Sequence, residues 1–443
     1  MPSMLPEQDQ YTDQEMLQRL QEDTFGYFTD SATCRNGLIA DKTQPGSVAS
    51  IAATGLGLSS YVAGVERGYI TREDAINKTL DILRFFKNSR QGKEKDATGY
   101  KGFYYHFLDM ETGLRAWSSE LSTVDTAILI AGVLTSASYF TNDTEEEKEI
   151  RSTADELYRR VDWQWALNKG KSLTHGWRPG RGFLKPRWDK GYSEAHILYI
   201  LALGSPTYPI DKACYDGWVS TFEWNNVYGT DYICAGPLFI HQMSHMWLDF
   251  RSIHDELNRK CGIDYFENSH RAVCIQQQYA IRNPMGFERY GPHCWGLSAS
   301  DGPGPARRTI KGVKRRFYDY IARGVPDGPD DGTVSPWAVV ASLPFAPEIV
   351  LDTIRHIIEQ LKLSQDGGHI GLHASFNATY PEKDENPNGW VSKWQFGLNQ
   401  GPVVIMIENY LTGLIWKIMS GNPYIINGLK KAGFTGGWLD NVK

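Results

Sequence analysis

The sequence lacks the short motifs that define several common classes of enzyme and binding protein. It has no GxGxxG or GxxxxGK[ST] segment, so the usual glycine-rich phosphate loops are excluded. It has no CxxC pair and its six cysteines show no regular spacing, so neither a zinc cluster nor a disulfide framework is expected. The thiols are predicted to be free and buried. These cysteines are Cys34, Cys214, Cys234, Cys261, Cys274 and Cys294.

The sequence also lacks a strong charge excess and any long apolar run. It has 46 Lys and Arg against 52 Asp and Glu, a net charge of −6, so neither nucleic acid nor a membrane surface is expected as a partner. No apolar run reaches membrane-spanning length, and the N-terminal segment lacks the apolar core of a signal peptide. We expect a cytoplasmic protein, or a periplasmic or secreted one from which an export signal has been removed. Residues 1–12 are predicted to be flexible.

Aromatic residues are abundant. The chain has 14 Trp and 23 Tyr, and many of them stand beside Gly, Pro, Arg or His instead of inside apolar runs. Such aromatics indicate a groove for a flat-faced ligand, although Trp also fills protein cores.

Apolar periodicity predicts about twelve helices in a single domain spanning residues 1–443. Thr12 and Thr71 are the expected N-caps of the first and third helices. The predicted helices cover residues 12–30, 48–66, 71–86, 120–139, 144–167, 193–203, 211–223, 237–250, 253–282, 335–343, 347–363 and 401–419.

Long loops separate alternate helices and are rich in Gly, aromatic and charged residues. They cover residues 99–117, 175–192, 283–308 and 373–390, and loops of this length in a compact domain are usually functional. Short alternation, as in GFYYHFLD, predicts small β hairpins on the same face. Short turns at one end and long loops at the other favour an all-α fold, the closed double ring of an (α/α)6 barrel. An α-solenoid is the alternative, but the sequence has no fixed repeat.

The segment from Phe183 to Ala202 carries the strongest chemical signal. Ser193 is predicted to cap a helix, which puts Glu194 in its first turn, near the positive end of the helix dipole. Complementing that dipole is one role for Glu194. The indole of Trp188 and the cations upstream favour a sugar site, where a protonated carboxyl cleaves the glycosidic bond. Glu194 is therefore our candidate general acid, with a pKa predicted to be raised by burial or by a neighbouring acid.

A second acidic group lies in residues 117–126, WSSELSTVDT. Ser118 or Ser119 is predicted to cap the helix that follows. Asp125 falls in an apolar segment, where a carboxylate costs free energy unless it is paired or faces a polar cavity. A buried structural acid fits Asp125 equally well. Glu120 fits a capping residue better than a catalyst, and both acids remain candidate catalytic residues.

A third polar group lies near the C-terminus. Glu408 interrupts an apolar helix that starts at Gln400, so its carboxylate points either to an internal hydrogen bond, which we favour, or into the active site. Asp301 sits in a loop that could cover a cleft. Three further loop acids are of the same kind: Glu382, Asp384 and Glu385.

Two histidines have the spacing of metal ligands. His241 and His245 are four residues apart, with Asp249 one turn further on, so all three could bind a metal from one helix face. The HExxH pattern and a third-ligand signal are both missing, which favours histidines in the core or in a groove. We expect neither a metal nor a cofactor.

Four long motifs, taken in order along the chain, resemble the glycoamylase-like proteins of glycoside hydrolase family 144. They are GYSEAHILYILALGSPTYPI, QQQYAIRNPMGFERYGPHCWGLSASDGP, DGTVSPWAVVASLPFAPE and NQGPVVIMIENYLTGLIW. The resemblance covers residues 15 to 435. It implies an (α/α)6 barrel that hydrolyses β-1,2-glucan or its sophorose-type oligosaccharides with inversion and without a metal, inside the polymer or from one end. It also places Glu194 of GYSE as the catalytic acid and the acids of WSSELSTVD in the same pocket.

The chain departs from the family pattern at two places. Asn399 of LNQGP stands where the pattern has the acid of IDQGP, and GPGPARR replaces a loop richer in Gly and Tyr. The linkage, the chain length and the reaction itself, hydrolysis or transglycosylation, therefore stay open.

The mechanism we expect pairs Glu194 with a base across the barrel mouth. Glu194 protonates the departing oxygen, and a carboxylate activates water, with Asp125 placed ahead of Glu120, Asp301 and Glu408. The expected sugar contacts, each equally consistent with a core or loop-anchoring role, are Trp117, Trp188, Tyr192, Trp295 and Trp390 by stacking and His106, Arg115, Lys190 and Gln400 by hydrogen bonds.

Two rival functions remain. The same barrel could serve an epimerase, with a histidine pair at the cavity floor, or a lyase, with a Tyr or His base beside cations. Alternatively, the chain could bind glucan without catalysis.

Overall fold

The computed structural model describes residues 11–31, 36–363, 371–381 and 387–442, and most of the helices form two concentric rings. The α-helices are α1 (Asp13–Gly26), α2 (Ile51–Arg67), α3 (Arg72–Asn88), α4 (Thr123–Tyr139), α5 (Glu145–Arg160), α6 (Trp163–Ala166), α7 (His196–Gly204), α8 (Lys212–Val219), α9 (Glu256–Cys261), α10 (Tyr265–Arg282), α11 (Pro336–Val340), α12 (Pro347–Glu359), α13 (Gly397–Leu411), α14 (Leu414–Ser420) and α15 (Pro423–Ala432). A short π-helix covers Tyr27–Ser31, and 3-10 turns cover Leu238–His241, Ser244–Met246 and Gly437–Asn441.

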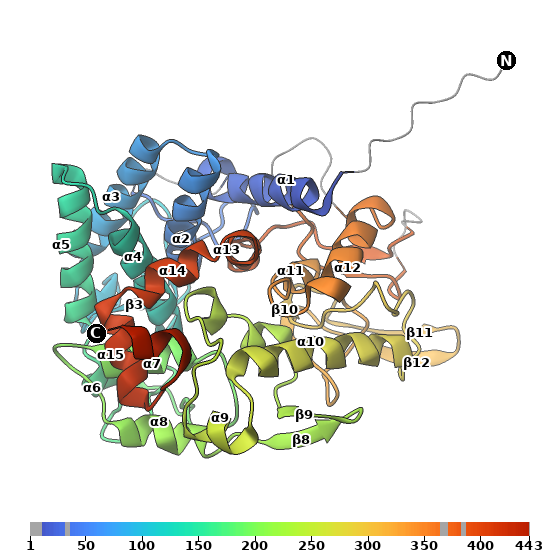
Figure 1. Cartoon of the computed structure of the whole chain (residues 1–443). Helices are drawn as coiled ribbons and strands as arrows, with labels where there is room; N and C mark the ends of the chain where they lie inside the picture. The colour runs from blue at the N-terminus through green and yellow to red at the C-terminus, as the bar shows by residue number, and fades with distance from the viewer. Residues whose placement is uncertain (1–10, 32–35, 364–370, 382–386, 443) are drawn as a thin grey trace.

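The inner ring consists of α2, α4, α7, the 3-10 segment 238–246, α11 and α13. Each of these elements is followed or preceded by an outer helix, and α3 and α5 lie outside α2 and α4 in Figure 1. This alternation is the (α/α)6 barrel, so the predicted fold is confirmed. Inner helices are buried all round, as α2 is from Ile51 to Gly64.

Small residues let the two central helices α2 and α4 approach closely. A side chain at Gly55 would meet the Ile128 carbonyl oxygen at 2.5 Å, and one at Gly132 would meet the Gly55 carbonyl oxygen at 2.0 Å. The run of small residues in 48–66 is therefore a packing requirement of this contact.

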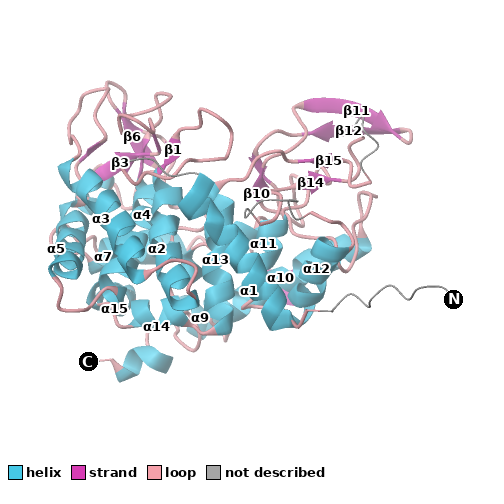
Figure 2. Cartoon of the chain, turned by 90° about the horizontal axis from the view of Figure 1, so that it is seen from above, coloured by secondary structure: helices cyan, strands magenta, loops and turns pink. Residues whose placement is uncertain are grey.

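Short strands form a layer on one side of the barrel. They are β1 (Ala49–Ser50), β2 (Gly99–Tyr100), β3 (Phe103–Tyr105), β4 (Phe107–Leu108), β5 (Leu121–Ser122), β6 (Gly176–Arg178), β7 (Gly182–Phe183), β8 (Trp224–Val227), β9 (Thr230–Ile233), β10 (Ala299–Ser300), β11 (Ala306–Ile310), β12 (Val313–Phe317), β13 (Ile321–Ala322), β14 (Phe376–Asn377) and β15 (Trp390–Val391). One five-stranded sheet has the order β2-β3-β5-β6-β7, and the other strands pair as β1-β4, β8-β9, β10-β13, β11-β12 and β14-β15. The strands labelled in Figure 2 lie above the helices. The prediction of small β hairpins on one face, made from the long loops, is therefore confirmed.

Several helix boundaries follow the sequence signals. Thr12 caps α1 in a capping box with Glu15, and the Thr71 hydroxyl accepts a hydrogen bond from the Asp74 N–H, so both predicted caps are confirmed. Other predictions are wrong in detail. Residues 253–282 form two helices divided at Gly262, and 401–419 is divided between α13 and α14, which are bent by 86°. The sequence analysis also missed α15.

The predicted helix 237–250 is the largest error. Only two 3-10 turns form there, because tertiary donors draw its carbonyl groups away from helical partners. The His241 carbonyl accepts from Ser269, the His245 carbonyl from the Trp416 indole, and the Met246 carbonyl from Asn409.

Five of the six cysteines lie in the described residues, and all five are free thiols. Cys214 and Cys294 are buried, as predicted, but the other three, Cys234, Cys261 and Cys274, are half-buried. Cys34 falls outside the described residues, as do the acids Glu382, Asp384 and Glu385 and most of the segment 1–12 predicted to be flexible. Among the described helices no single one is long and apolar enough to span a bilayer, and only the bent pair α13 and α14 meets that test together.

Candidate active site

A cavity of about 140 Å³ lies where the inner elements meet the loop layer. Four inner helices direct their N-terminal ends toward it, so their positive dipole ends favour carboxylates and other oxygen ligands there. The lining residues are Val124, Asp125 and Ile128 from α4, Glu194 just ahead of α7, Phe239 and Met243 from the 3-10 segment, Trp337 from α11, Leu398 and Asn399 from α13, and Ala299 and Tyr320 from the loop layer.

Glu194 is placed by a contact between distant segments. The Ser244 hydroxyl donates to the Glu194 carbonyl oxygen at 2.7 Å and accepts from the Ile197 N–H at 3.0 Å, so it caps α7 from outside. The prediction that Ser193 is the N-cap is wrong, because α7 begins at His196 and Ala195 precedes it without a side-chain cap. Glu194 therefore lies in the turn before the helix.

The Glu194 carboxyl has the protonation behaviour that a general acid needs. Burial raises its pKa to about 7, and the charge of Asp125 acts in the same direction. The predicted rise is confirmed. The cations just upstream do not oppose it, since Arg187 donates to the carbonyls of Leu167 and Ser172 and Lys190 is exposed.

Asp125 belongs to a chain of charged groups that runs away from the pocket. Its Oδ2 accepts from the Ser122 hydroxyl and lies 3.6 Å from His106 Nε2, and His106 Nδ1 lies 3.1 Å from Glu120 Oε1. Arg178 closes the chain at 3.2 Å from Glu120 Oε2. His106 thus joins two carboxylates that are five residues apart in the sequence.

The pKa values agree with an imidazolium held between carboxylates. Burial by itself lowers the pKa of His106, but the charge of Asp125 and the hydrogen bond and charge of Glu120 outweigh it and raise the value to about 9. The hydrogen bond from His106 lowers the pKa of Glu120 to about 2, against the opposite effect of burial. Glu120 is therefore not the capping residue that the sequence indicated. Ser122 is the N-cap of α4, in place of Ser118 or Ser119.

Asp41 is a further acid near His106 and Asp125, and it was not predicted from the sequence. Burial raises the pKa of its carboxyl, Lys42 and His106 lower it, and Asp125 raises it. Asp41 follows the strand-like segment before α2, and nothing in the sequence distinguishes it from other loop acids.

Asn399 and Trp337 bring polar atoms to the pocket that have no partner among the described residues. Asn399 is 1% exposed, and both its amide nitrogen and its amide oxygen lack a hydrogen bond. The indole nitrogen of Trp337, which is 2% exposed, is in the same state. Buried polar groups are nearly always bonded, so these atoms mark a place for ligand hydroxyls. The departure from IDQGP was the sequence signal for Asn399, whereas Trp337 gave none.

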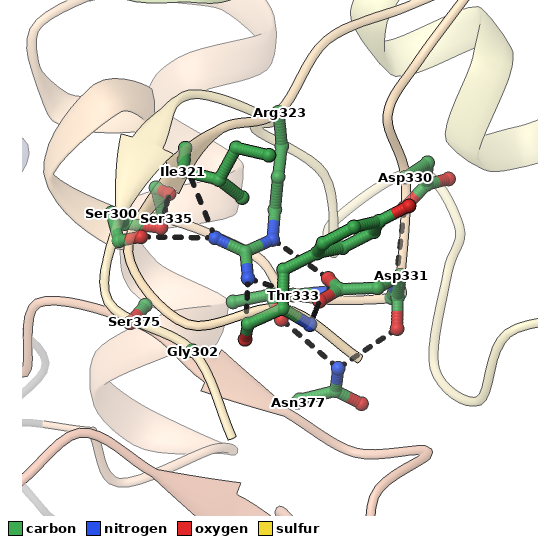
Figure 3. A network of polar contacts seen from close by, with 12 residues as sticks. Ser300, Gly302, Ile321, Arg323, Asp330, Asp331, Thr333, Ser335, Ser375 and Asn377 are labelled. Atoms are coloured by element: carbon green, nitrogen blue, oxygen red, sulfur yellow. Dashed lines mark hydrogen bonds and ion pairs between the residues drawn. The ribbon is translucent and has the colours of Figure 1, made fainter. Parts of the chain in front are cut away.

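A buried ion pair fixes the loop that carries Tyr320. The Arg323 guanidinium is fully buried and donates to both carboxylate oxygens of Asp331, at 2.7 and 2.9 Å (Figure 3). It also donates to the carbonyl oxygens of Ser300 at 2.9 Å and Tyr318 at 3.3 Å. Because these bonds join the strands β10 and β13, they set the position of Tyr320 at the pocket.

Three of the expected stacking platforms are core residues, and that prediction is wrong for them. Trp295 is fully buried with its indole bonded to Thr353 at 3.0 Å. Trp188 and Tyr192 are 9% and 5% exposed, the first stacked on His175 at 3.9 Å between ring centroids. Side chains this deep cannot offer a ring face to a sugar.

Other predicted ligands hold the scaffold together. Glu408 is 1% exposed and pairs with Arg67 at 2.7 Å, at the end of α13 remote from the pocket. The internal contact favoured for it is confirmed, and the active-site alternative is wrong. Arg115 donates to the carbonyl oxygens of Ser118 and Ser119, both at 2.6 Å, and anchors that loop.

The remaining predicted contacts are not among the residues that line the pocket. Gln400 is buried and bonded to Gln395 at 2.7 Å. Asp301 is half-buried, its carboxylate accepts from Ser392 at 3.0 Å, and burial raises its pKa. Trp117 is 64% exposed and Trp390 is half-buried in β15. Their contacts with sugar stay predictions.

The two histidines of HQMSH are core residues. Both are 1% exposed, His241 Nε2 lies 3.1 Å from the Ala235 carbonyl oxygen, and His245 Nε2 lies 3.0 Å from the Ser269 hydroxyl. Burial lowers the pKa of both rings. Within the described residues no group of three His, Cys, Asp or Glu side chains could hold a metal ion.

A protein-family model described as "Putative glucoamylase", of the glycoamylase family, matches residues 187–423, more than half of the chain. The chain belongs to the glycoamylase family. The matched region contains Glu194, Tyr320, Trp337 and Asn399, and thus most of the pocket of this family member.

Similar proteins cover nearly the whole chain. A putative glucoamylase from Bacteroides uniformis has a TM-score of 0.85 and 32% identity over 98% of this chain and all of its own. An endo-β-1,2-glucanase from Chitinophaga pinensis, solved with sophorotriose and glucose, has a TM-score of 0.84 and 28% identity over 97% of this chain and all of its own. An exo-β-1,2-glucooligosaccharide sophorohydrolase from Parabacteroides distasonis is 30% identical over 95% of this chain, and the chain spans 58% of that relative's length.

Proposed function

We propose that this glycoamylase-family chain hydrolyses β-1,2-linked glucan or its oligosaccharides with inversion at the anomeric carbon. The observation that carries the proposal is the half-buried Glu194 carboxyl, whose pKa is raised to about 7, in one cavity with Asp125. The β-1,2-glucan activities named for the relatives from C. pinensis and P. distasonis support this substrate class.

In the proposed reaction Glu194 gives its proton to the glycosidic oxygen as the bond to the anomeric carbon breaks. Asp125 takes a proton from the water that attacks the opposite face, so the new hydroxyl has the inverted configuration. Both described contacts of Asp125 engage Oδ2, which leaves Oδ1 for this water. Exchange with solvent then returns a proton to Glu194 and removes one from Asp125.

The row of His106, Glu120 and Arg178 orients the Asp125 carboxylate. The imidazolium lies 3.6 Å from the carboxylate, and Glu120 holds that imidazolium in place at 3.1 Å. His106 already carries a proton at neutral pH, so it is unsuited to be the base of a lyase or an epimerase. No histidine is among the described lining residues of the pocket, which also argues against an epimerase.

Asn399 supplies hydrogen bonds in this scheme and no proton transfer. An amide can donate and accept at once, so it can bond a sugar hydroxyl next to the reacting bond. Because position 399 holds no carboxylate, water activation depends on Asp125.

The test is product analysis with linear β-1,2-glucan and with sophorose-type oligosaccharides of defined length. We expect shorter oligosaccharides, with the α-anomer as the first product by proton NMR, and a kcat lowered by about 10²- to 10⁴-fold in Glu194→Gln. The size distribution over time separates internal cleavage from cleavage at one end. Retained β-configuration would replace inversion with a double-displacement mechanism. Longer chains formed at the expense of hydrolysis would replace hydrolysis with glycosyl transfer. No turnover with retained oligosaccharide binding would favour a glucan-binding protein.

A further inference from the structure

The hairpin of β11 and β12 concentrates positive charge that the proposed mechanism does not use. Residues 302–318 contain no acid, in a chain with a net charge of −6. Within this stretch the hairpin carries six cations: Arg307, Arg308, Lys311, Lys314, Arg315 and Arg316.

Two pairs of these cations face each other across the strands. Arg307 is opposite Arg316, and Arg308 is opposite Arg315. Like charges directly opposite each other destabilise a two-stranded sheet, so the hairpin carries this arrangement at a cost in stability. A bound anion would remove that repulsion.

One face of the hairpin is used for packing against the protein body. Arg315 donates to the carbonyl oxygens of Met285 at 3.1 Å and Gly286 at 2.9 Å, and its guanidinium lies 4.5 Å from the centre of the Phe287 ring. Phe317, on the same face, is fully buried.

The opposite face is an exposed basic surface, which we define as Arg307, Thr309, Lys314 and Arg316. These four side chains share a face because strand residues alternate and 307–316 and 309–314 are cross-strand partners. All four are exposed, and none of the three cations forms an ion pair with a carboxylate among the described residues. A hollow of about 420 Å³ is lined entirely by hairpin residues, including these four.

The basic surface is joined directly to the active site. Arg316 and Tyr320 are four residues apart, at most about 14 Å along an extended chain. Tyr320 lines the pocket, and the Arg323 network fixes the strand that follows it (Figure 3). Figure 2 shows the hairpin on the loop side of the barrel, the same side as β10. The hairpin thus lies on the same side of the barrel as the pocket and is linked to its wall by a few residues.

We propose that the basic surface binds phosphate monoesters carried on hydroxyls of the glucan. Guanidinium groups pair with such groups through two parallel hydrogen bonds, and Thr309 adds a hydroxyl donor. The overall charge of −6 repels an extended anionic surface such as nucleic acid or a membrane, whereas a single substituent meets only the local positive field. This inference rests on the proposed function for the identity of the glucan. The hairpin adds that the bound glucan carries negative charge.

The experiment measures binding by calorimetry in the Glu194→Gln background, so that little of the probe is consumed. The two probes are a β-1,2-linked glucotetraose and the same tetrasaccharide with a phosphate monoester on a 6-hydroxyl. The hairpin variant combines Arg307→Gln, Lys314→Gln and Arg316→Gln. A control variant with the same change in charge combines Arg84→Gln, Arg159→Gln and Lys260→Gln, three exposed positions on α3, α5 and α9.

We expect the phosphorylated probe to bind about tenfold more tightly than the neutral one at low salt, the scale of a few exposed charge pairs acting together. The hairpin variant loses this preference and binds the neutral probe unchanged, the control variant keeps it, and 0.5 M NaCl removes it. Equal affinity of the parent for both probes, or an equal loss for both probes in the hairpin variant, overturns the proposal.

A further arm uses vesicles of phosphatidylglycerol. Hairpin-dependent binding to these vesicles without any preference between the two probes overturns the proposal in favour of a membrane surface. The proposed function fails by a different result, the absence of binding and cleavage of the neutral tetrasaccharide by the parent chain.

Discussion

Asp125 Oδ2 lies 3.6 Å from His106 Nε2, and this contact connects the pocket to a row of charges that ends at Arg178. It gives the two carboxyls of the pocket different roles. Asp125 lies beside a cation, whereas burial and the Asp125 charge raise the pKa of Glu194 to about 7.

Glu194→Gln should lower kcat by about 10²- to 10⁴-fold while oligosaccharide affinity stays within a few-fold, because the amide cannot donate the proton that the leaving oxygen needs. A dinitrophenyl β-sophoroside, whose leaving group needs no proton, should still be cleaved. Steady-state kinetics on both substrates measure this. Equal losses on the two substrates would show that Glu194 is not the acid.

The pH dependence of kcat/KM should have a basic limb near pH 7, because Glu194 must be protonated to act and its pKa is about 7. In Asp125→Asn the neighbouring negative charge is gone, so the pKa of Glu194 should fall and more of it should be ionised at pH 7. Carbon-13 NMR of labelled glutamate follows the titration directly, in a comparison with Glu194→Gln to assign the signal. A Glu194 pKa that is unchanged in Asp125→Asn contradicts the coupling.

Replacing Asn399 separates hydrogen bonding from charge. Asn399→Leu removes both amide groups from the pocket and should reduce kcat/KM by about tenfold to a hundredfold, the value of one or two hydrogen bonds, without loss of thermal stability. Asn399→Asp instead adds a carboxylate to a cavity that holds two, which should raise the pKa of Glu194 and move the basic limb upward. Leu398→Met, in the same wall, is the control. Full activity in Asn399→Leu would remove Asn399 from the site.

His106 should make stability depend on pH. Its pKa rises from about 6.5 in the unfolded chain to about 9 in the folded protein, so its contribution is complete below pH 6.5 and is lost as the pH rises through 9. Denaturant titrations of the parent and His106→Asn at pH 6 and pH 9.5 measure this, and the gap between the two proteins should narrow at the higher pH. A gap of constant size contradicts the raised pKa.

The ion pair of Glu408 and Arg67 should matter for stability and not for catalysis. Arg67→Met leaves Glu408 buried without its partner and should cost about 3 kcal/mol of unfolding free energy, with kcat/KM unchanged below the new transition. Urea unfolding and kinetics at 20 °C measure the two quantities. A large fall in kcat at full stability would return Glu408 to the active site.

Local signals in the sequence were sufficient for much of the fold. Apolar periodicity and the caps Thr12 and Thr71 located most helices, because those signals act within one turn. They failed at residues 237–250, where the helical pattern is overridden by donors from Ser269, Trp416 and Asn409. The stacking predictions for Trp295 and Trp188 failed for the same reason. Their sequence neighbours are those of a sugar-binding aromatic residue, but tertiary packing places both side chains in the core.

The sequence by itself determined the helical barrel and the family, because apolar periodicity and four ordered motifs can be read directly along the chain. It also made Glu194 the candidate acid. Only the tertiary structure decided what surrounds that acid. Ser244 caps its helix from fifty residues away, and His106 joins Asp125 to Glu120. Burial and nearby charges shift the pKa of a carboxyl, and they come from whichever segments the fold brings close to it. No local sequence pattern shows which segments these are.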